Sequence, residues 1–343
     1  MQQADNFKEY ISAFEKELER VVIDSISPEP YCKKYLSHLL LHKRYYLAIY
    51  ADVLQKIVAH SCKNKSAITL VDYGSGNGLL GIFARFCGFK KVILNDIDAK
   101  FVKASEQLAA QLNIMVDGYV TGGINDLQSY CKNEMPDAIA GTDVIEHIYD
   151  LEGFLSCLQQ INESMVSVFT TGSNPANLLK VSRLKKIQMK DELQGGEPGD
   201  HLLFGENPLE PFLKIREQAI RKNCDKLTDK EIMELAKATR GMIEADIIKA
   251  VSIYLVSKKL PEPAEGYNTC NPLNGSWTER ILSFRTYISL YETAGFTCKF
   301  YAGFYNEYES GAKAFVKKLL NAFIGISGNR ISPYIVIVGY KAK

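Results

Sequence analysis

The stretch from Val71 to Gly81 constrains the fold of this chain more than any other part of its sequence. An apolar run at residues 67–71 is followed by a cluster of glycines at residues 74–78 and then by an amphipathic segment, residues 82–87. A short apolar run, a glycine turn and helical spacing together predict a strand, a turn and a helix. Such a unit begins an open parallel sheet whose carboxyl edge binds a ligand, so the turn is the candidate cofactor site.

The glycines of this turn can be counted in two ways. Gly76, Gly78 and Gly81 satisfy the dinucleotide pattern G-x-G-x-x-G, and Asp96 lies about twenty residues beyond the first of them, as a ribose-binding acid should. In that register, however, the first glycine comes some distance after the end of the strand. Counted from the strand, the pattern is a hydrophobic residue followed by D-x-G-x-G-x-G, residues 71–78.

The second pattern resembles the first motif of the class I S-adenosylmethionine-dependent methyltransferases. Charge favours the same register. A dinucleotide would place its pyrophosphate at the turn, where the carboxylate of Asp72 repels it, whereas S-adenosylmethionine carries a sulfonium and an ammonium that the carboxylate attracts. The resemblance implies S-adenosyl-L-methionine as the cofactor, with the glycines letting the backbone approach its methionine part and Asp72 binding a water or its amino group.

Strands and helices alternate regularly from residue 67 to residue 172, which predicts a parallel sheet covered on both faces. The strands expected after the first are residues 91–95, 116–121, 137–141, 165–171, 295–301 and 334–340. Helices are expected at residues 98–112, 151–161 and 311–323. The resemblance implies that the last strand is antiparallel, in the order 3-2-1-4-5-7-6. The expected fold class is therefore α/β, a Rossmann-like class I methyltransferase with a mixed seven-stranded sheet.

Four segments are expected along the chain: N-terminal helices (1–66), the cofactor-binding core (67–172), a helical insertion (173–280) and the completion of the core sheet (281–343). Residues 31–50 contain several tyrosines, and we expect most of them to pack on the core and a few to line a pocket. The insertion follows the fifth strand, so we interpret it as a cap that recognises substrate and excludes water. Its expected elements are a loop at residues 190–200 and helices at 209–223, 228–239 and 242–258. A further helix is expected at residues 279–294.

Side chains after the second and third strands complete the candidate cofactor site. The carboxylate of Asp96 can accept hydrogen bonds from both hydroxyls of a ribose, and Asp98 suits the helix N-cap better. Relatives often carry an acid where Gly123 stands, so Ile124 or Asn125 is expected to make the adenine contact instead. The expected cofactor-binding residues are Asp72, Gly74, Gly76, Asn77, Gly78, Asp96, Ile97, Ile124, Asn125, Thr142 and Asp143.

The stretch D-V-I-E-H, residues 143–147, follows the fourth expected strand. It resembles a segment of the methyltransferase subgroup that includes the ubiquinone-biosynthesis O-methyltransferases, and it differs from the N-P-P-Y type motif of DNA amino-methyltransferases. The resemblance implies that Thr142 and Asp143 border the donor while Glu146 and His147 face the substrate. An imidazole can take a proton near neutral pH, so His147 is the first candidate for a general base and His201 the second. No metal is expected, because the carboxylates are already assigned to the donor.

Composition and charge argue against nucleic acid and membranes as partners. The 343 residues are 46% hydrophobic, and the formal net charge of +1 gives no global footprint for nucleic acid or a membrane surface. The N-terminus has no basic region followed by an apolar core, and no run reaches eighteen apolar residues. The eight cysteines are scattered, which favours free thiols in a reducing compartment. We therefore expect a cytoplasmic protein without a nucleic-acid or membrane partner.

The combined prediction is an S-adenosylmethionine-dependent methyltransferase that transfers a methyl group to a hydroxyl of a small molecule or glycan precursor. Three alternatives differ in chemistry. The first is an N-methyltransferase acting on a small-molecule amine. The second is an NAD-dependent oxidoreductase that uses the other glycine register. The third is a methyltransferase-like binding protein without turnover.

Overall fold

The computed structural model describes residues 6–196 and 210–341, and the chain divides into two compact units. Unit 1 consists of Met1–Ile145, Leu151–Thr171 and Ser283–Lys343. Unit 2 consists of Glu146–Asp150 and Gly172–Leu282. The chain therefore leaves unit 1 twice, once briefly after the fourth strand and once for a long stretch after the fifth.

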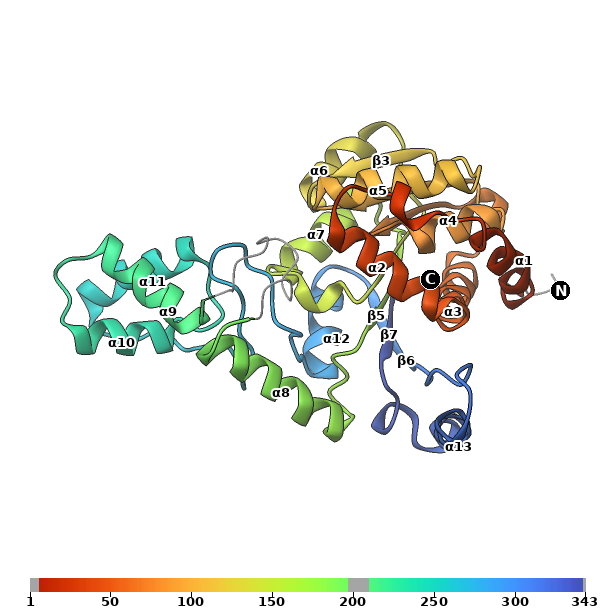
Figure 1. The fold of residues 1–343 in the computed structure, drawn as a ribbon. Helices are drawn as coiled ribbons and strands as arrows, with labels where there is room; N and C mark the ends of the chain where they lie inside the picture. The colour runs from red at the N-terminus through yellow and green to blue at the C-terminus, as the bar shows by residue number, and fades with distance from the viewer. Residues whose placement is uncertain (1–5, 197–209, 342–343) are drawn as a thin grey trace. The chain divides into compact units, whose positions relative to one another are not determined.

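Unit 1 is built on a seven-stranded sheet in the order β3-β2-β1-β4-β5-β7-β6 (Figure 1). Strands β1 to β5 run parallel, and β7 runs antiparallel to both of its neighbours, β5 and β6. This arrangement confirms the predicted fold class and strand order. The strands are β1 (Thr69–Tyr73), β2 (Lys91–Asp96), β3 (Gly118–Thr121), β4 (Ala138–Thr142), β5 (Val166–Thr171), β6 (Thr297–Ala302) and β7 (Ile335–Tyr340).

Most of the helices described in unit 1 bury apolar side chains. In the first helix Ile11, Phe14 and Leu18 recur at intervals of three and four and are buried. Phe154 lies 5.0 Å between ring centroids from Tyr73 of β1. The helices are α1 (Lys8–Leu18), α2 (Pro30–Leu41), α3 (Lys43–Ser61), α4 (Leu79–Phe86), α5 (Ala99–Gln111), α6 (Ile124–Tyr130), α7 (Leu151–Ile161), α12 (Phe284–Thr293) and α13 (Ala312–Ser327). Short 3-10 helices are η1 (Ile23–Ser25), η2 (Lys65–Ala67), η3 (Cys131–Asn133) and η5 (Gly328–Arg330).

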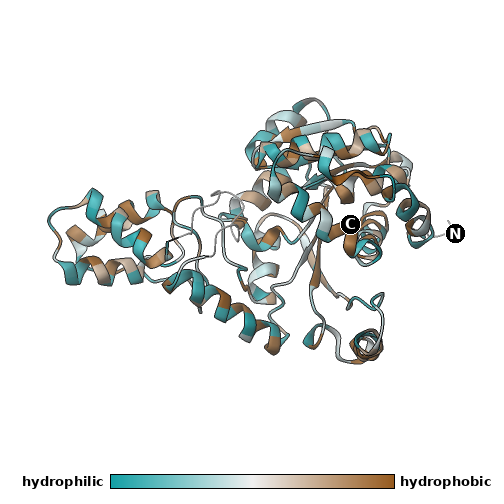
Figure 2. Ribbon diagram, viewed as in Figure 1, coloured by the Kyte–Doolittle hydropathy of each residue, from teal (hydrophilic) through white to brown (hydrophobic). Residues whose placement is uncertain are grey.

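The described part of unit 2 contains four α-helices: α8 (Leu178–Leu193), α9 (Phe212–Asn223), α10 (Asp229–Ala238) and α11 (Glu244–Ser257). The last three share a small apolar core that includes Ile220, Leu235 and Ile247, all completely buried. Figure 2 shows the hydrophobic residues distributed along these helices among hydrophilic ones. The capping box predicted at the start of α10 is confirmed, because Thr228 and Glu231 each accept a hydrogen bond from the backbone N–H of the other.

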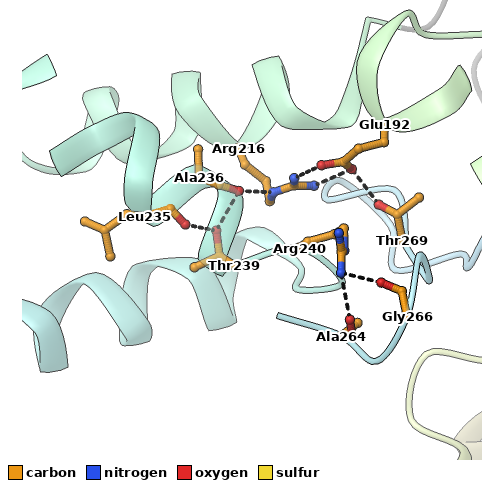
Figure 3. A network of polar contacts seen from close by, with 9 residues as sticks. All are labelled: Glu192, Arg216, Leu235, Ala236, Thr239, Arg240, Ala264, Gly266 and Thr269. Atoms are coloured by element: carbon orange, nitrogen blue, oxygen red, sulfur yellow. Dashed lines mark hydrogen bonds and ion pairs between the residues drawn. The ribbon is translucent and has the colours of Figure 1, made fainter. Parts of the chain in front are cut away.

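A buried ion pair joins α8 to α9 (Figure 3). The completely buried guanidinium of Arg216 bonds both carboxylate oxygens of Glu192 and donates through Nε to the carbonyl of Ala236 at 2.8 Å. The hydroxyl of Thr269 donates to Oε2 of Glu192 at 2.8 Å. Every charge in this cluster is therefore hydrogen-bonded, as burial requires.

Two predictions about this part of the chain are wrong. The loop expected at residues 190–200 begins inside a helix, because α8 continues to Leu193; residues 197–200 lie outside the described part. The helix expected from Glu279 begins only at Phe284, where the hydroxyl of Ser283 caps it by accepting from the N–H of Thr286. Glu279 itself has a φ of 47°, which no helical residue adopts.

Candidate functional site

Three glycines with positive φ shape the turn after β1: Gly74 at 65°, Gly76 at 53° and Gly78 at 77°. All three also lack room for a side chain, and a Cβ at Gly74 would lie 2.5 Å from Cγ2 of Val144. A Cβ at Gly76 would lie 2.9 Å from Cε1 of Tyr35, and one at Gly78 would lie 2.6 Å from Cδ1 of Leu94. Positive φ favours glycine by itself, and close packing adds a second reason. Tyr35, from α2, therefore lies directly against the turn.

The side chain of Asp72, near the end of β1, forms a hydrogen bond to α4, the helix after the turn. Its Oδ2 accepts a hydrogen bond from the N–H of Gly81 in α4 at 2.8 Å, and the residue is 2% exposed. Burial raises the pKa of Asp72 to about 7, although the hydrogen bond from Gly81 lowers it. Near neutral pH a large share of the molecules therefore lack the charge that favoured S-adenosylmethionine in the sequence argument. The structure shows Asp72 positioning the turn, and its contact with a cofactor stays a prediction.

The raised pKa of Asp72 predicts that folding stability falls as pH rises. A carboxyl in an unfolded chain titrates near about 3.9, so between about pH 4 and 7 the folded state holds a proton that the unfolded state has lost. The free energy of unfolding should therefore decrease through this window and level off above it. Asp72→Asn cannot ionise at this position and should show a smaller decrease. Urea unfolding followed by circular dichroism tests this, and parallel pH profiles for the two proteins would contradict it.

Asp96, the last residue of β2, is held by backbone N–H groups of two neighbouring turns. Its Oδ2 accepts from Gly76 at 2.8 Å and its Oδ1 from Asp98 at 2.9 Å. Burial raises the pKa of this carboxyl, and these hydrogen bonds oppose the rise. Each oxygen has a second lone pair, so the carboxylate can accept further hydrogen bonds. Asp98 accepts from the N–H of Lys100 at 2.9 Å, which confirms its predicted role as the N-cap of α5.

Three buried polar atoms at this edge of the sheet have no hydrogen-bond partner within the described residues: Oγ of Ser75, Oδ1 of Asn77 and Oδ1 of Asn95. The amide nitrogen of Asn77 donates to the carbonyl of Cys32 at 3.2 Å, and that of Asn95 donates to the carbonyl of Val120 at 3.1 Å. A buried acceptor costs free energy unless some donor reaches it. The turn therefore suits a ligand that carries several N–H or O–H groups.

The loops after β2 and β3 carry the residues predicted to contact adenine. Ile97 is 67% exposed, Ile124 begins α6 and is half-buried, and Asn125 is exposed. Near Gly123, which stands where relatives often have an acid, the carboxylate of Asp126 accepts from the N–H of Gly123 at 2.9 Å. Asp126, in the first turn of α6, therefore satisfies the backbone N–H at the N-cap of its own helix. The adenine contacts stay predictions.

Thr142 ends β4 and is half-buried, and Asp143 after it is exposed with a φ of 55°. Such a φ is uncommon for a residue other than glycine. Burial raises the pKa values of Tyr45 and Tyr46, and the charge of Asp143 raises them further. Both phenols therefore stay protonated at neutral pH. Tyr45 and Tyr46 of α3 therefore lie close enough to Asp143, the residue predicted to border the donor, to interact with its charge.

His147 lies in η4 (Ile145–His147), and a hydrogen bond in unit 2 orients its ring. Its Nδ1 is 2.7 Å from the carbonyl oxygen of Trp277. A carbonyl oxygen only accepts, so Nδ1 carries the hydrogen and Nε2 of the neutral ring carries the lone pair. Trp277 is held in turn, because its indole N–H donates to the carbonyl of Tyr149 at 3.2 Å and its ring stacks on that tyrosine.

The other two predicted catalytic residues have different environments. Glu146 is 1% exposed, and its carbonyl accepts from the N–H of Arg280 at 3.2 Å. The structure thus joins η4 to the segment around Trp277 through both Glu146 and His147. His201 lies outside the described residues.

Sequence reasoning missed the roles that the structure gives to three residues at these sites. Ser75 and Asn95 carry unsatisfied buried atoms, and Trp277 orients His147. A polar residue at the end of an apolar strand is a usable signal, and it would have pointed to Asn95. The pairing of Trp277 with His147 spans most of unit 2, and no local pattern shows it.

The chain is similar to proteins of one class, over limited parts of their length. It is 35% identical over 86 residues to the ribosomal protein L11 methyltransferase of Acinetobacter baumannii (strain SDF), which is 25% of this chain and 27% of that protein. It is 24% identical over 120 residues to the ubiquinone biosynthesis O-methyltransferase of Rickettsia akari (strain Hartford), covering 35% of this chain and 46% of that one. The chain thus spans less than half the length of these curated relatives.

Among solved structures, the chain is similar to magnesium protoporphyrin IX methyltransferase from Synechocystis PCC 6803 with bound SAH, at 11% identity and a TM-score of 0.39. That match covers 97% of this chain and 96% of the other. No family model matches the chain. The strand order of unit 1, with β7 antiparallel between β5 and β6, differs from the 3-2-1-4-5-6 order of dinucleotide-binding sheets. Unit 1 has the Rossmann-like fold of the class I methyltransferases.

Proposed function

We propose that this chain is an S-adenosylmethionine-dependent methyltransferase whose acceptor is a hydroxyl group of a small molecule or glycan precursor. The observation that carries the first part is the set of unsatisfied acceptors around the glycine turn, on Ser75, Asn77 and Asn95. S-adenosylmethionine has an ammonium, two ribose hydroxyls and an adenine amino group, all of which donate hydrogen bonds. A dinucleotide would bring its pyrophosphate, which only accepts, to the same turn.

The residues at the carboxyl edge fit the donor. The glycine turn has the positive-φ backbone that the donor motif requires, and Asp96 keeps acceptor positions at the end of β2. The other predicted cofactor-binding residues lie at the carboxyl ends of the parallel strands β1 to β4 or directly after them. They are Asp72, Gly74, Gly78, Ile97, Ile124, Asn125, Thr142 and Asp143. When bound, S-adenosylmethionine would supply an electrophilic methyl group. The chain's own part is to align the acceptor with that group and to exclude water.

The hydroxyl acceptor is favoured by the state of His147. A hydroxyl must lose its proton when it is methylated, and a base with a fixed lone pair suits that step. The hydrogen bond from Nδ1 to the carbonyl of Trp277 leaves the lone pair on Nε2. His147 would therefore take the acceptor proton at Nε2. His147 is the last residue of the D-V-I-E-H stretch, five residues after Thr142. The resemblance of this stretch implies that His147 faces the substrate.

Calorimetric titration with S-adenosylmethionine and S-adenosylhomocysteine tests the donor site. Wild type should bind both in the micromolar to submillimolar range of enzyme substrates, and Asp96→Ala should weaken binding at least about tenfold, because it removes a charged acceptor. Asp98→Ala is the matched control, since it removes an N-cap of the next helix at a cost of about 1 kcal/mol in stability and should bind as wild type does. Binding of a nicotinamide dinucleotide in place of both compounds would overturn the proposal.

A further inference from the structure

Helix α13 lies on an insertion that the fold does not need. Strands β6 and β7 are antiparallel neighbours, and a two-residue turn suffices to join such a pair. Here residues 303–334 connect them, and α13 (Ala312–Ser327) fills half of that connection (Figure 1). An elaboration of this kind on an otherwise complete sheet calls for a role of its own.

The polar side of α13 is the side that holds it to unit 1. The side chain of Asn321 accepts from the N–H of Tyr305 at 2.7 Å and donates to the carbonyl of the same residue at 3.1 Å. It also donates to the carboxylate of Glu307 at 3.0 Å. Lys317 forms an ion pair with Glu309 at 2.6 Å. Helices of globular proteins normally turn their apolar side to the core, so α13 is reversed.

The apolar side of α13 is uncovered within the described part of the chain, where none of the helix's residues is buried. At about 100° per residue, its exposed large apolar side chains fall on one stripe opposite Asn321. They are Phe315 (65% exposed), Val316 (53%), Leu319 (46%), Phe323 (56%) and Ile326 (86%). Hydrophobic residues along this helix are visible in Figure 2. A contiguous exposed apolar stripe with two phenylalanines marks an interaction surface.

The positive charges beside this stripe indicate which kind of partner it binds. By the same helical spacing, the exposed Lys313 and Lys318 flank the stripe on its two sides, and the helix sequence contains no acidic residue. Phenylalanine and leucine on one face with lysines beside them are typical of a helix that lies in a membrane interface. A second copy docking by the same face would bring lysines against lysines without acids to pair them, which disfavours self-association.

We propose that α13 binds the surface of an anionic lipid bilayer, with its apolar stripe in the headgroup region and Lys313 and Lys318 on lipid phosphates. No helix in the described ranges, 6–196 and 210–341, is long and apolar enough to cross a membrane. A helix that lies on the surface needs no such length. The proposal revises the expectation of no membrane partner, which rested on the absence of a spanning run and on net charge.

Vesicle sedimentation of the full chain tests this proposal. Wild type should bind vesicles of phosphatidylcholine and phosphatidylglycerol in equal parts, and bind pure phosphatidylcholine more weakly. Phe315→Ser/Phe323→Ser should weaken binding more than about tenfold. Lys313→Gln/Lys318→Gln should weaken it roughly fivefold per lysine, with the loss disappearing at high salt. All four side chains are exposed, so the unfolding midpoint should not change.

The matched control is Leu41→Ser/Val256→Ser, which removes two apolar side chains that are 76% and 89% exposed on other helices. It should bind vesicles as wild type does. Equal binding by the phenylalanine variant and wild type would overturn the proposal, as would equal binding to the two kinds of vesicle. A wild-type dimer in light scattering, converted to monomer by the phenylalanine variant and without affinity for vesicles, would assign the stripe to a second copy instead.

Discussion

His147→Gln is expected to lower kcat for methyl transfer to a hydroxyl by about 10²- to 10⁴-fold, the usual contribution of a general base. The amide of glutamine has the size to replace part of the ring and can still donate to the carbonyl of Trp277, which accepts from Nδ1 of His147 at 2.7 Å. It cannot take a proton at the position of Nε2. The loss should therefore appear in kcat, while the affinity for S-adenosylmethionine in calorimetry stays unchanged.

His60→Gln is the matched control. His60 also has its Nδ1 hydrogen-bonded to a backbone carbonyl, that of Lys56 at 2.9 Å, but it lies on α3 and its Nε2 is near the hydroxyl of Tyr301. This variant should turn over normally. Transfer of a labelled methyl group to a panel of hydroxylated and amine acceptors provides the assay. A His147→Gln rate within about threefold of wild type would remove His147 from the mechanism, and His201→Gln would then be the next variant to measure.

Arg216→Ala is expected to destabilise unit 2 by about 3–5 kcal/mol, the range for breaking a buried ion pair from one side. The substitution leaves the carboxylate of Glu192 buried with the hydroxyl of Thr269 as its remaining partner in the cluster. It also leaves the carbonyl of Ala236 with only the longer hydrogen bond from the hydroxyl of Thr239, at 3.5 Å, within this cluster. Trp277 is the single tryptophan of the chain and belongs to unit 2, so its fluorescence during urea unfolding reports this unit.

Two further variants separate the ion pair from general effects of the substitution. Arg221→Ala, on the same helix, removes an exposed arginine that pairs with Glu217 and Asp229, and it should cost less than about 1 kcal/mol. The double variant Arg216→Met/Glu192→Leu removes both charges and should recover most of the loss, because apolar replacements of buried pairs are often neutral. Equal transitions for Arg216→Ala and Arg221→Ala would show that the buried pair contributes little.

Local sequence pattern determined most of unit 1 and the start of α10 in unit 2. The strands, the turn after β1, the N-cap at Asp98 and the capping box at Thr228 all depend on residues close together in the chain, where hydrophobic period and cap chemistry act directly. The antiparallel last strand followed from the resemblance of the glycine motif to a known family. In these regions neighbouring residues carry the information, so the sequence could be interpreted without the tertiary structure.

Tertiary structure alone decided the features that depend on distant partners. Helix α8 escaped prediction because three of its four buried residues, Gln188, Asp191 and Glu192, are polar, so no apolar stripe marks it. The burial of Arg216, the ring orientation of His147 and the close approach of Tyr35 to the glycine turn each require a partner many residues away. The pattern at residues 311–323 predicted a helix, but only the packed structure shows that its apolar side is left uncovered, because a hydrophobic period says that a face is apolar and not what lies against it.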